Sequence, residues 1–306
     1  MTARTAAENT DIIYEKRQGA AWITINRPET YNSLVGSTVR EITDSVTDAA
    51  EDPEIGVIVI TGAGDKAFSS GGNLQTLNQR SSLDSRNHMR RLAHLGVALR
   101  TCGKPTIAAV NGYAVGGGHE LHVMCDLTIA AEHAKFGQTG PKMGGMPVWG
   151  ASQLLHRMVG EKKAREIMFM CRLYTAKEAL EMGLVNQVVP MSELYPTVEQ
   201  WCKEILEESP QCLRVLKLAL NQESDANFWG SFFSGGELYA MHTGSPEFVE
   251  GTSARVAKRK PNFAQFRTRA PAPAKSWDHL DNGSLVLRPL SRVESCGEWP
   301  KWKMSS

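Results

Sequence analysis

The chain has 306 residues, 42% of them hydrophobic and 22% charged, so it can bury a sizeable core in one large domain, with or without an appendage. The net charge is +1 and no stripe of basic and aromatic residues occurs, so composition favours neither nucleic acid nor another polyanion as a partner. The longest apolar runs, such as residues 55–60, are far too short to cross a bilayer, and we expect no membrane association.

The N-terminal stretch MTARTAAENTD lacks the apolar core of a signal peptide. The six cysteines are scattered, without a CxxC or other paired spacing. We therefore expect a cytoplasmic protein whose thiols are free.

The first half of the chain alternates between strand and helix patterns. After a flexible arm at residues 1–10, two β-rich runs flank Gln18-Gly19, which predicts a hairpin. Apolar residues at helical spacing follow, and then buried strands that end in glycine-rich turns. The expected elements are strands at 12–16, 21–26, 55–60, 105–110 and 127–130, helices at 35–50, 85–101 and 119–125, and a glycine loop at 68–73.

The second half is richer in helices. We expect helices at 162–170, 175–183 and 192–206, a strand at 184–189, and mainly helix from residue 210 to about residue 259. Repeated strand–loop–helix units indicate an α/β protein. The expected organisation is a core at 11–205, a helical region at 206–266, and a loosely packed or irregular tail at 267–306.

Two glycine loops each follow an expected buried strand. The triplet Gly116–Gly118 lies at a strand-to-helix turn, where the first N–H groups of the helix have no partner within it. An oxygen that becomes negative during a reaction is stabilised at such a place. A lone triplet is more often a packing turn, but Ser69-Ser70-Gly71-Gly72-Asn73 is a second loop of this kind. Neither loop matches the P-loop or the GxGxxG pattern.

Glu120 lies three residues after Gly117, on the same face of the expected helix. A partly buried carboxylate there has a raised pKa and suits acid–base chemistry near neutral pH. A solvent-facing residue or a structural ion pair is the alternative. His119 and His122 are spaced too closely for a helical zinc pair, and we expect packing roles and no metal. No GxSxG surrounds a serine, which argues against a serine triad.

Several motifs together resemble the crotonase superfamily, the enoyl-CoA hydratase/isomerase fold. They are NRPETYNSL (26–34), AFSSGGN (67–73), the stretch from KPTIAAVNGYAVGGGHEL to EHAKFGQ (104–138), AKEALEMGLVNQVV (176–189) and VEGTSARVAKRKPNF (249–263). The resemblance covers roughly residues 12–265. It implies a spiral of ββα units, like that of ClpP, with a C-terminal helical region for oligomerisation, usually in trimers or dimers of trimers.

The resemblance also implies the chemistry. Family members bind acyl-CoA thioesters and stabilise a thioester enolate, so CoA enters as part of the substrate and no permanently bound cofactor is expected. By this resemblance Gly72 and Gly117 form the oxyanion hole and Glu120 is the acid–base group. The expected substrate and CoA contacts are Asn32, Ser33, Leu34, Ser70, Gly71, Gly116, Gly140, Trp149, Lys258 and Lys260.

The subfamily is ambiguous. Enoyl-CoA hydratases generally carry a second glutamate two residues after the Gln of FGQ, where this chain has Gly140. The stretches FGQTGPKMG and GEKKAREI look more like 1,4-dihydroxy-2-naphthoyl-CoA synthase and 2-ketocyclohexanecarboxyl-CoA hydrolase. Yet the Gly-Ser-x-Asp that usually follows in those enzymes is missing, and Asn73 replaces the aspartate of SGGD.

We therefore expect a lyase that hydrates an α,β-unsaturated acyl-CoA, or catalyses the reverse dehydration, with Glu120 as acid and base. The alternatives are ring-forming or ring-opening carbon–carbon chemistry on a cyclic oxoacyl-CoA, and a catalytically weak acyl-CoA-binding scaffold. Trp149 is expected to narrow or reshape the acyl pocket, or to pack on the surface of the core, and a loop at 75–83 is expected to close over the substrate.

Overall fold

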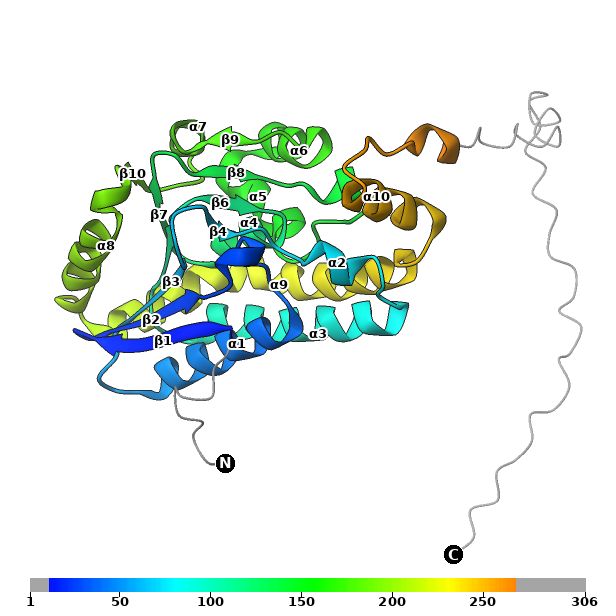
Figure 1. Cartoon of the computed structure of the whole chain (residues 1–306). Helices are drawn as coiled ribbons and strands as arrows, with labels where there is room; N and C mark the ends of the chain where they lie inside the picture. Colours follow the sequence, from blue (N-terminus) through cyan, green and yellow to red (C-terminus); the bar gives the residue numbers. More distant parts are fainter. Residues whose placement is uncertain (1–10, 268–306) are drawn as a thin grey trace, which may run out of the picture. The chain divides into compact units, whose positions relative to one another are not determined.

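The computed structural model describes residues 11–267 (Figure 1). The expected arm at 1–10 and nearly all of the expected tail lie outside this range. One compact unit ends at Ala264, and a second begins at Gln265. Everything below concerns the described part of the first unit.

A six-stranded sheet forms the frame of this unit, in the order β1-β2-β3-β5-β7-β10. The first two strands are the antiparallel hairpin expected around Gln18-Gly19, and the other neighbours run parallel. The strands are β1 (Ile12–Arg17), β2 (Ala20–Ile25), β3 (Val57–Gly62), β5 (Thr106–Val110), β7 (Leu127–Ala131) and β10 (Gln187–Val189).

A second, four-stranded sheet holds the segments that follow these strands. Its order is β4-β6-β8-β9, and the first three strands are parallel. They are β4 (Ala67–Ser69), β6 (Tyr113–Val115), β8 (Lys135–Gly137) and β9 (Tyr174–Thr175). β3, β5 and β7 are each followed by a short strand of this sheet, and the chain then returns to the large sheet. This repeated return makes the expected spiral of ββα units.

Helices cover both faces of the large sheet. The helices of the described part are α1 (Gly36–Glu51), α2 (Leu74–Leu77), α3 (Ser82–Thr101), α4 (Gly117–Met124), α5 (Ala151–Val159), α6 (Glu161–Met170), α7 (Ala176–Glu181), α8 (Met191–Leu206), α9 (Pro210–His242) and α10 (Pro246–Val256). The 3-10 turns are η2 (Pro28–Thr30), η3 (Gly140–Met143) and η4 (Phe263–Phe266).

Alternate residues of the parallel strands enter two separate cores. Ile58, Ile60 and Ala108 belong to the larger core, which α1, α3, α4 and α9 also fill. Val57, Val59 and Ile107 face the opposite way and pack against Leu194, Val198 and Cys202 of α8. Because both faces of these strands are buried, they read as continuous apolar runs rather than as alternating patterns.

α9 is a single helix that lies beside α3 (Figure 1). Ser209 caps its first turn, and Phe228 and Phe232 extend from it into the larger core. α9 therefore contributes to the same core as the spiral. The expected boundary between a core and a helical region at residue 205 stays a prediction.

The short strands of the small sheet, α2 and α5 are elements that the sequence did not predict. β4, β6 and β8 have three residues each, too few for a periodic pattern. The segment expected as a loop at 75–83 contains the end of α2 and the start of α3. The Ser81 side chain accepts a hydrogen bond from the Asp84 amide, which starts α3 three residues earlier than expected.

Candidate active site

The two glycine loops lie against each other where β4 and β6 end. A Cβ atom on Gly71 would overlap the amide nitrogen of Gly117, and a Cβ atom on Gly118 would overlap the carbonyl oxygen of Ser69. Gly71 also has φ +77°, a backbone conformation that other residues rarely adopt. Glycines are needed at these positions because the two backbones are in contact and leave no room for a Cβ atom.

Two N–H groups at this junction have no acceptor among the described residues. Gly117 is the first residue of α4, so its N–H has no partner within the helix. Leu34 donates to the Gly71 carbonyl in a parallel bridge that leaves the Gly72 N–H unused. Within residues 11–267 neither N–H donates to another protein atom. A Cβ atom on Gly117 would be 3.8 Å from the Gly72 nitrogen, so both donors border the same small space.

Glu120 is buried in the first turn of α4, with 6% of its surface exposed. Its Oε1 accepts hydrogen bonds from the Trp149 amide at 2.7 Å and the Ala151 amide at 3.4 Å. Burial raises the pKa of Glu120 from its ordinary 4.5 to about 8, although both hydrogen bonds oppose the rise. A solvent-facing role is therefore ruled out, and the carboxyl group can exchange a proton near neutral pH.

The Trp149 contact to Glu120 comes from the backbone. Its indole ring is almost fully buried in the larger core rather than on the surface of that core. A role in shaping the acyl pocket stays a prediction. Gly150 follows with φ +113°, and it turns the chain so that the first amides of α5 face the carboxyl group. No sequence pattern connects Glu120 with a segment thirty residues later, so this contact was not predicted.

Residues 32–34, which are expected to contact CoA, pack against the two glycine loops. The Asn32 side chain is fully buried; it accepts from the Arg27 amide and donates to the carbonyls of Ala63 and Ala67. The side chain thus fixes the turn between β3 and β4 and is not free to contact CoA. Ser33 donates to Thr30. A Leu34 methyl carbon is 3.8 Å from the Cβ position of Gly117.

The other expected contacts are spread around these loops. Ser70 hydrogen-bonds the Tyr31 and Thr30 carbonyls, and Gly116 is in the left-handed region with φ +56°. Lys258 and Lys260 are exposed beyond the end of α10. α10 contacts α2 and η3, which brings this basic segment to the same end of the fold as the loops.

Gly140 begins η3, and its carbonyl accepts from the Gly145 amide. A Cβ atom there would be 3.2 Å from the Gly145 carbonyl oxygen, so the turn leaves little room for a side chain. No acidic side chain among the described residues contributes to the pKa of Glu120. Glu120 thus lacks a carboxylate partner.

Tyr239 of α9 is a neighbour that the sequence did not indicate. Burial raises the pKa of its phenol, and the ring lies close enough to feel Arg80, which lowers the pKa, and Glu120, which raises it. Since α9 is distant in sequence from both, only its packing beside α3 brings the tyrosine there.

His119 and His122 are buried, and the ring centroids are 4.9 Å apart. His119 contacts Gln138 and His122 contacts Thr128, and burial lowers the pKa of His119 to about 3. Across residues 11–267 no three His, Cys, Asp or Glu side chains cluster as a metal site would require. Both histidines have the packing roles that we expected.

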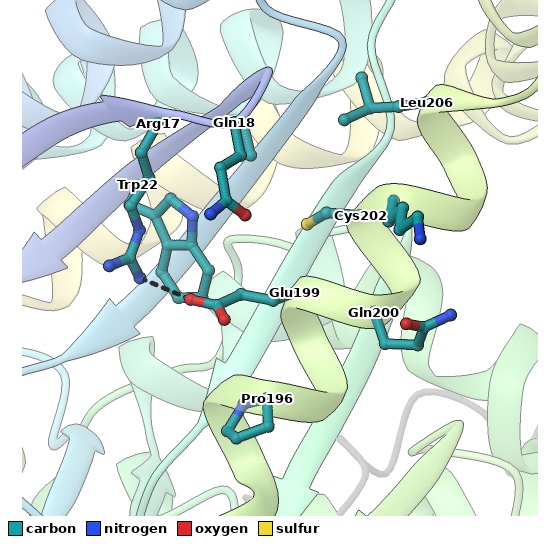
Figure 2. A pocket seen from close by; sticks show the side chains of 10 residues that line it. Arg17, Gln18, Trp22, Pro196, Glu199, Gln200, Cys202 and Leu206 are labelled. Atoms are coloured by element: carbon teal, nitrogen blue, oxygen red, sulfur yellow. Dashed lines mark ion pairs between the residues drawn. The ribbon is translucent and has the colours of Figure 1, made fainter.

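Two surface cavities lie elsewhere. One, of about 410 Å³, lies between the β1–β2 turn and α8, where Arg17 pairs with Glu199 and stacks on Trp22 (Figure 2). The other, of about 390 Å³, borders Lys104 and Pro210. Neither is lined by Glu120 or by the glycine loops. We place the candidate site at the loops because, within residues 11–267, unpaired backbone donors lie within one helical turn of a buried, proton-exchanging acid there.

The arrangement can bind a carbonyl oxygen and move a proton next to it. Two N–H groups can stabilise a developing oxyanion, and an acid with a pKa near 8 can exchange a proton with a nearby carbon or water.

Comparisons with known proteins show which family the chain resembles. A family model described as enoyl-CoA hydratase/isomerase matches residues 15–267. An enoyl-CoA hydratase from Mycobacterium avium subsp. paratuberculosis K-10 is 31% identical, with 83% of this chain and 98% of that chain covered and a TM-score of 0.75. An enoyl-CoA hydratase/isomerase from Xanthobacter autotrophicus Py2 is 32% identical, with 86% and 99% covered and a TM-score of 0.74. For an enoyl-CoA hydratase from Bacillus halodurans the identity is 26%, the coverage 80% and 100%, and the TM-score 0.76.

Proposed function

Because the chain belongs to the enoyl-CoA hydratase/isomerase family, we propose that it hydrates the double bond of an enoyl-CoA thioester, or catalyses the reverse dehydration. The buried Glu120 carboxyl group beside two unpaired amides is the observation that carries this proposal. The site residues act through the following steps.

The thioester carbonyl oxygen accepts hydrogen bonds from the N–H groups of Gly72 and Gly117. Ionised Glu120 removes a proton from water, and the hydroxide oxygen bonds to the β-carbon of the substrate. Electrons of the double bond shift to the carbonyl oxygen, where the two amides stabilise the enolate. Glu120 then returns the proton to the α-carbon. The sum is one water added, and Glu120 ends in the state in which it began.

A mass-spectrometric panel of enoyl- and oxoacyl-CoA esters tests this function. Hydration adds one water to an enoyl ester without creating a new carboxyl group. A panel in which no enoyl ester gains water, while acyl-CoA still binds, would favour the scaffold alternative.

The pH dependence of hydration follows from the raised pKa of Glu120. The reaction needs the carboxylate, yet a group with a pKa of about 8 is mostly protonated at neutral pH. We expect kcat/KM to rise about tenfold per pH unit below about pH 7.5 and to level off above about pH 8. Initial rates measured in buffers of constant ionic strength test this, and a rate independent of pH over the same interval would contradict the role.

The second candidate is carbon–carbon chemistry on a cyclic oxoacyl-CoA. The glycine at position 140, where a two-glutamate hydratase carries its second acid, favours it. Ring hydrolysis also adds water, but it consumes a ketone and creates a carboxylate, so derivatising the product for ketone and carboxyl groups separates the two reactions.

We also propose that the chain works as a homotrimer or a dimer of trimers. α9 exposes large apolar side chains, among them Leu220, Phe233 and Met241, of the kind that protein interfaces cover. Sedimentation equilibrium should return three or six times the mass of one chain, and a monomer would contradict this assembly. No described helix is long and apolar enough to cross a membrane. The cytoplasmic location remains part of this proposal.

A further inference from the structure

A cluster of basic side chains lies near the candidate site and takes no part in the proposed hydration. It consists of Arg80, at the turn before α3, and of His88 and Arg91 on α3, and is called the arginine cluster below. His88 and Arg91 are three residues apart and so share one face of the helix. Arg80 interacts electrostatically with both of them.

His88 is buried, both arginines are half-buried, and two nitrogens of the cluster have no partner among the described residues. His88 is 8% exposed, and its Nδ1 has no hydrogen-bond partner; the buried Nε of Arg91 has none either. Over residues 11–267 neither arginine forms an ion pair with an acidic side chain. Buried polar atoms are nearly always hydrogen-bonded. The two unpaired nitrogens and the two arginine charges are therefore free to pair with a group that binds from outside the chain.

Asp84 is the acidic residue that acts on both arginines, and it does not pair with either. Its carboxylate accepts hydrogen bonds from the amide and the hydroxyl of Ser81 in the first turn of α3. Burial, together with the two arginines, lowers the pKa of His88 to about 3, so this histidine is neutral at pH 7. The net charge of the cluster comes from Arg80 and Arg91.

The arginine cluster lies close to the glycine loops and to Glu120. The Arg80 amide donates to the carbonyl of Leu77, whose side chain is 3.2 Å from the Cβ position of Gly72. The Arg91 guanidinium is 3.2–3.3 Å from the Cβ position of Gly36, two residues after Leu34. On the other side, Tyr239 interacts with both Arg80 and Glu120. These contacts place the arginine cluster close to the candidate site.

We propose that Arg80 and Arg91 bind a second carboxylate at the far end of the acyl group, so that the substrate is the CoA thioester of a dicarboxylic acid. The inference rests on the acyl-CoA function proposed above. The planar guanidinium forks match the two oxygens of a carboxylate, and such charge-assisted hydrogen bonds are about twice as strong as neutral ones. The neutral His88 imidazole supplies a further donor or acceptor.

Calorimetric binding of unreactive saturated esters tests the proposal, because it requires no turnover. Each ω-carboxyacyl-CoA, from succinyl to pimelyl, is compared with the acyl-CoA of equal chain length that ends in a methyl group. In the wild-type protein we expect at least one carboxylated ester to bind about tenfold or more tightly than its methyl counterpart. Affinities that are equal at every chain length would overturn the proposal.

Arg91→Met and Arg80→Met remove one charge each and keep an unbranched side chain of similar length. Each variant is expected to lose most of the preference for the carboxylated ester while binding the methyl esters as the wild type does. Arg90→Met is the matched control, because Arg90 is an exposed neighbour on the same helix. The proposal fails if the preference survives in both cluster variants or disappears in the control as well.

The phosphates of CoA are a second source of negative charge. If the cluster held them, Arg91→Met would weaken both members of each pair equally, and thioesters of pantetheine, which lacks these phosphates, would not respond to the change. That result would overturn the proposal that the cluster binds a carboxylate of the acyl group. If the protein preferred the carboxylated esters but hydrated no enoyl ester, the proposed reaction would be contradicted. The proposed ligand of the arginine cluster would still stand.

Discussion

Changing Glu120 to Gln is expected to lower the hydration rate by at least about 10³-fold while leaving the fold and the affinity for saturated acyl-CoA esters nearly unchanged. One acid–base group contributes about 10²–10⁴-fold, and here a single residue carries both proton transfers. The amide oxygen of Gln can still accept the hydrogen bonds from Trp149 and Ala151, so the junction with α5 is preserved. Steady-state rates together with calorimetric binding give the comparison.

The control for the Glu120→Gln variant is the dependence of its thermal stability on pH. The folded-state pKa of Glu120, about 8, exceeds its ordinary value of 4.5. The wild-type protein therefore keeps this contribution to stability below about pH 4.5 and loses it as the pH rises to about 8. Glu120→Gln cannot ionise, so its Tm should equal or exceed that of the wild type at alkaline pH. A variant with full activity, or one that unfolds in alkaline buffer, would contradict the burial and role of Glu120.

Changing Gly71 to Ala is expected to reduce kcat by about 10²–10³-fold, the cost of losing one oxyanion donor. The new Cβ atom would overlap the Gly117 nitrogen, so the two loops must move apart. The amides of Gly72 and Gly117 would then no longer face one oxygen. Because backbone donors cannot be removed by changing side chains, this displacement is the direct test of the junction.

Gly64 offers a matched control. Its φ of +78° equals that of Gly71 within one degree, but a Cβ atom there meets nothing within 4 Å. Gly64→Ala therefore imposes the same backbone strain, a destabilisation of about 1 kcal/mol, without touching the site. We expect Gly64→Ala to keep near wild-type turnover at a lowered Tm. Equal losses of turnover in the two variants would mean that strain, rather than loop geometry, explains the effect.

Local features of the sequence predicted most of the frame. The apolar runs of β3, β5 and β7 and the periodic face of α1 are intrinsic to those segments, and the structure confirms them. The three-residue strands of the small sheet carry no periodic signal, since their conformation depends on neighbours from other turns of the spiral. Residues 75–83 were wrongly expected to be only a loop, because the start of α3 depends on the Ser81–Asp84 capping box rather than on apolar spacing.

By itself the sequence determined that two glycine loops follow two buried strands and that a glutamate lies one helical turn after the second loop. Both follow from the spacing of residues along the chain, which does not depend on how distant segments pack. Tertiary packing alone decided that the loops touch, that Glu120 faces the amides of Trp149 and Ala151, and that α9 places Tyr239 near Arg80. The pKa of Glu120 belongs to this second group, because it is set by removal from water, and that depends on segments distant in the chain.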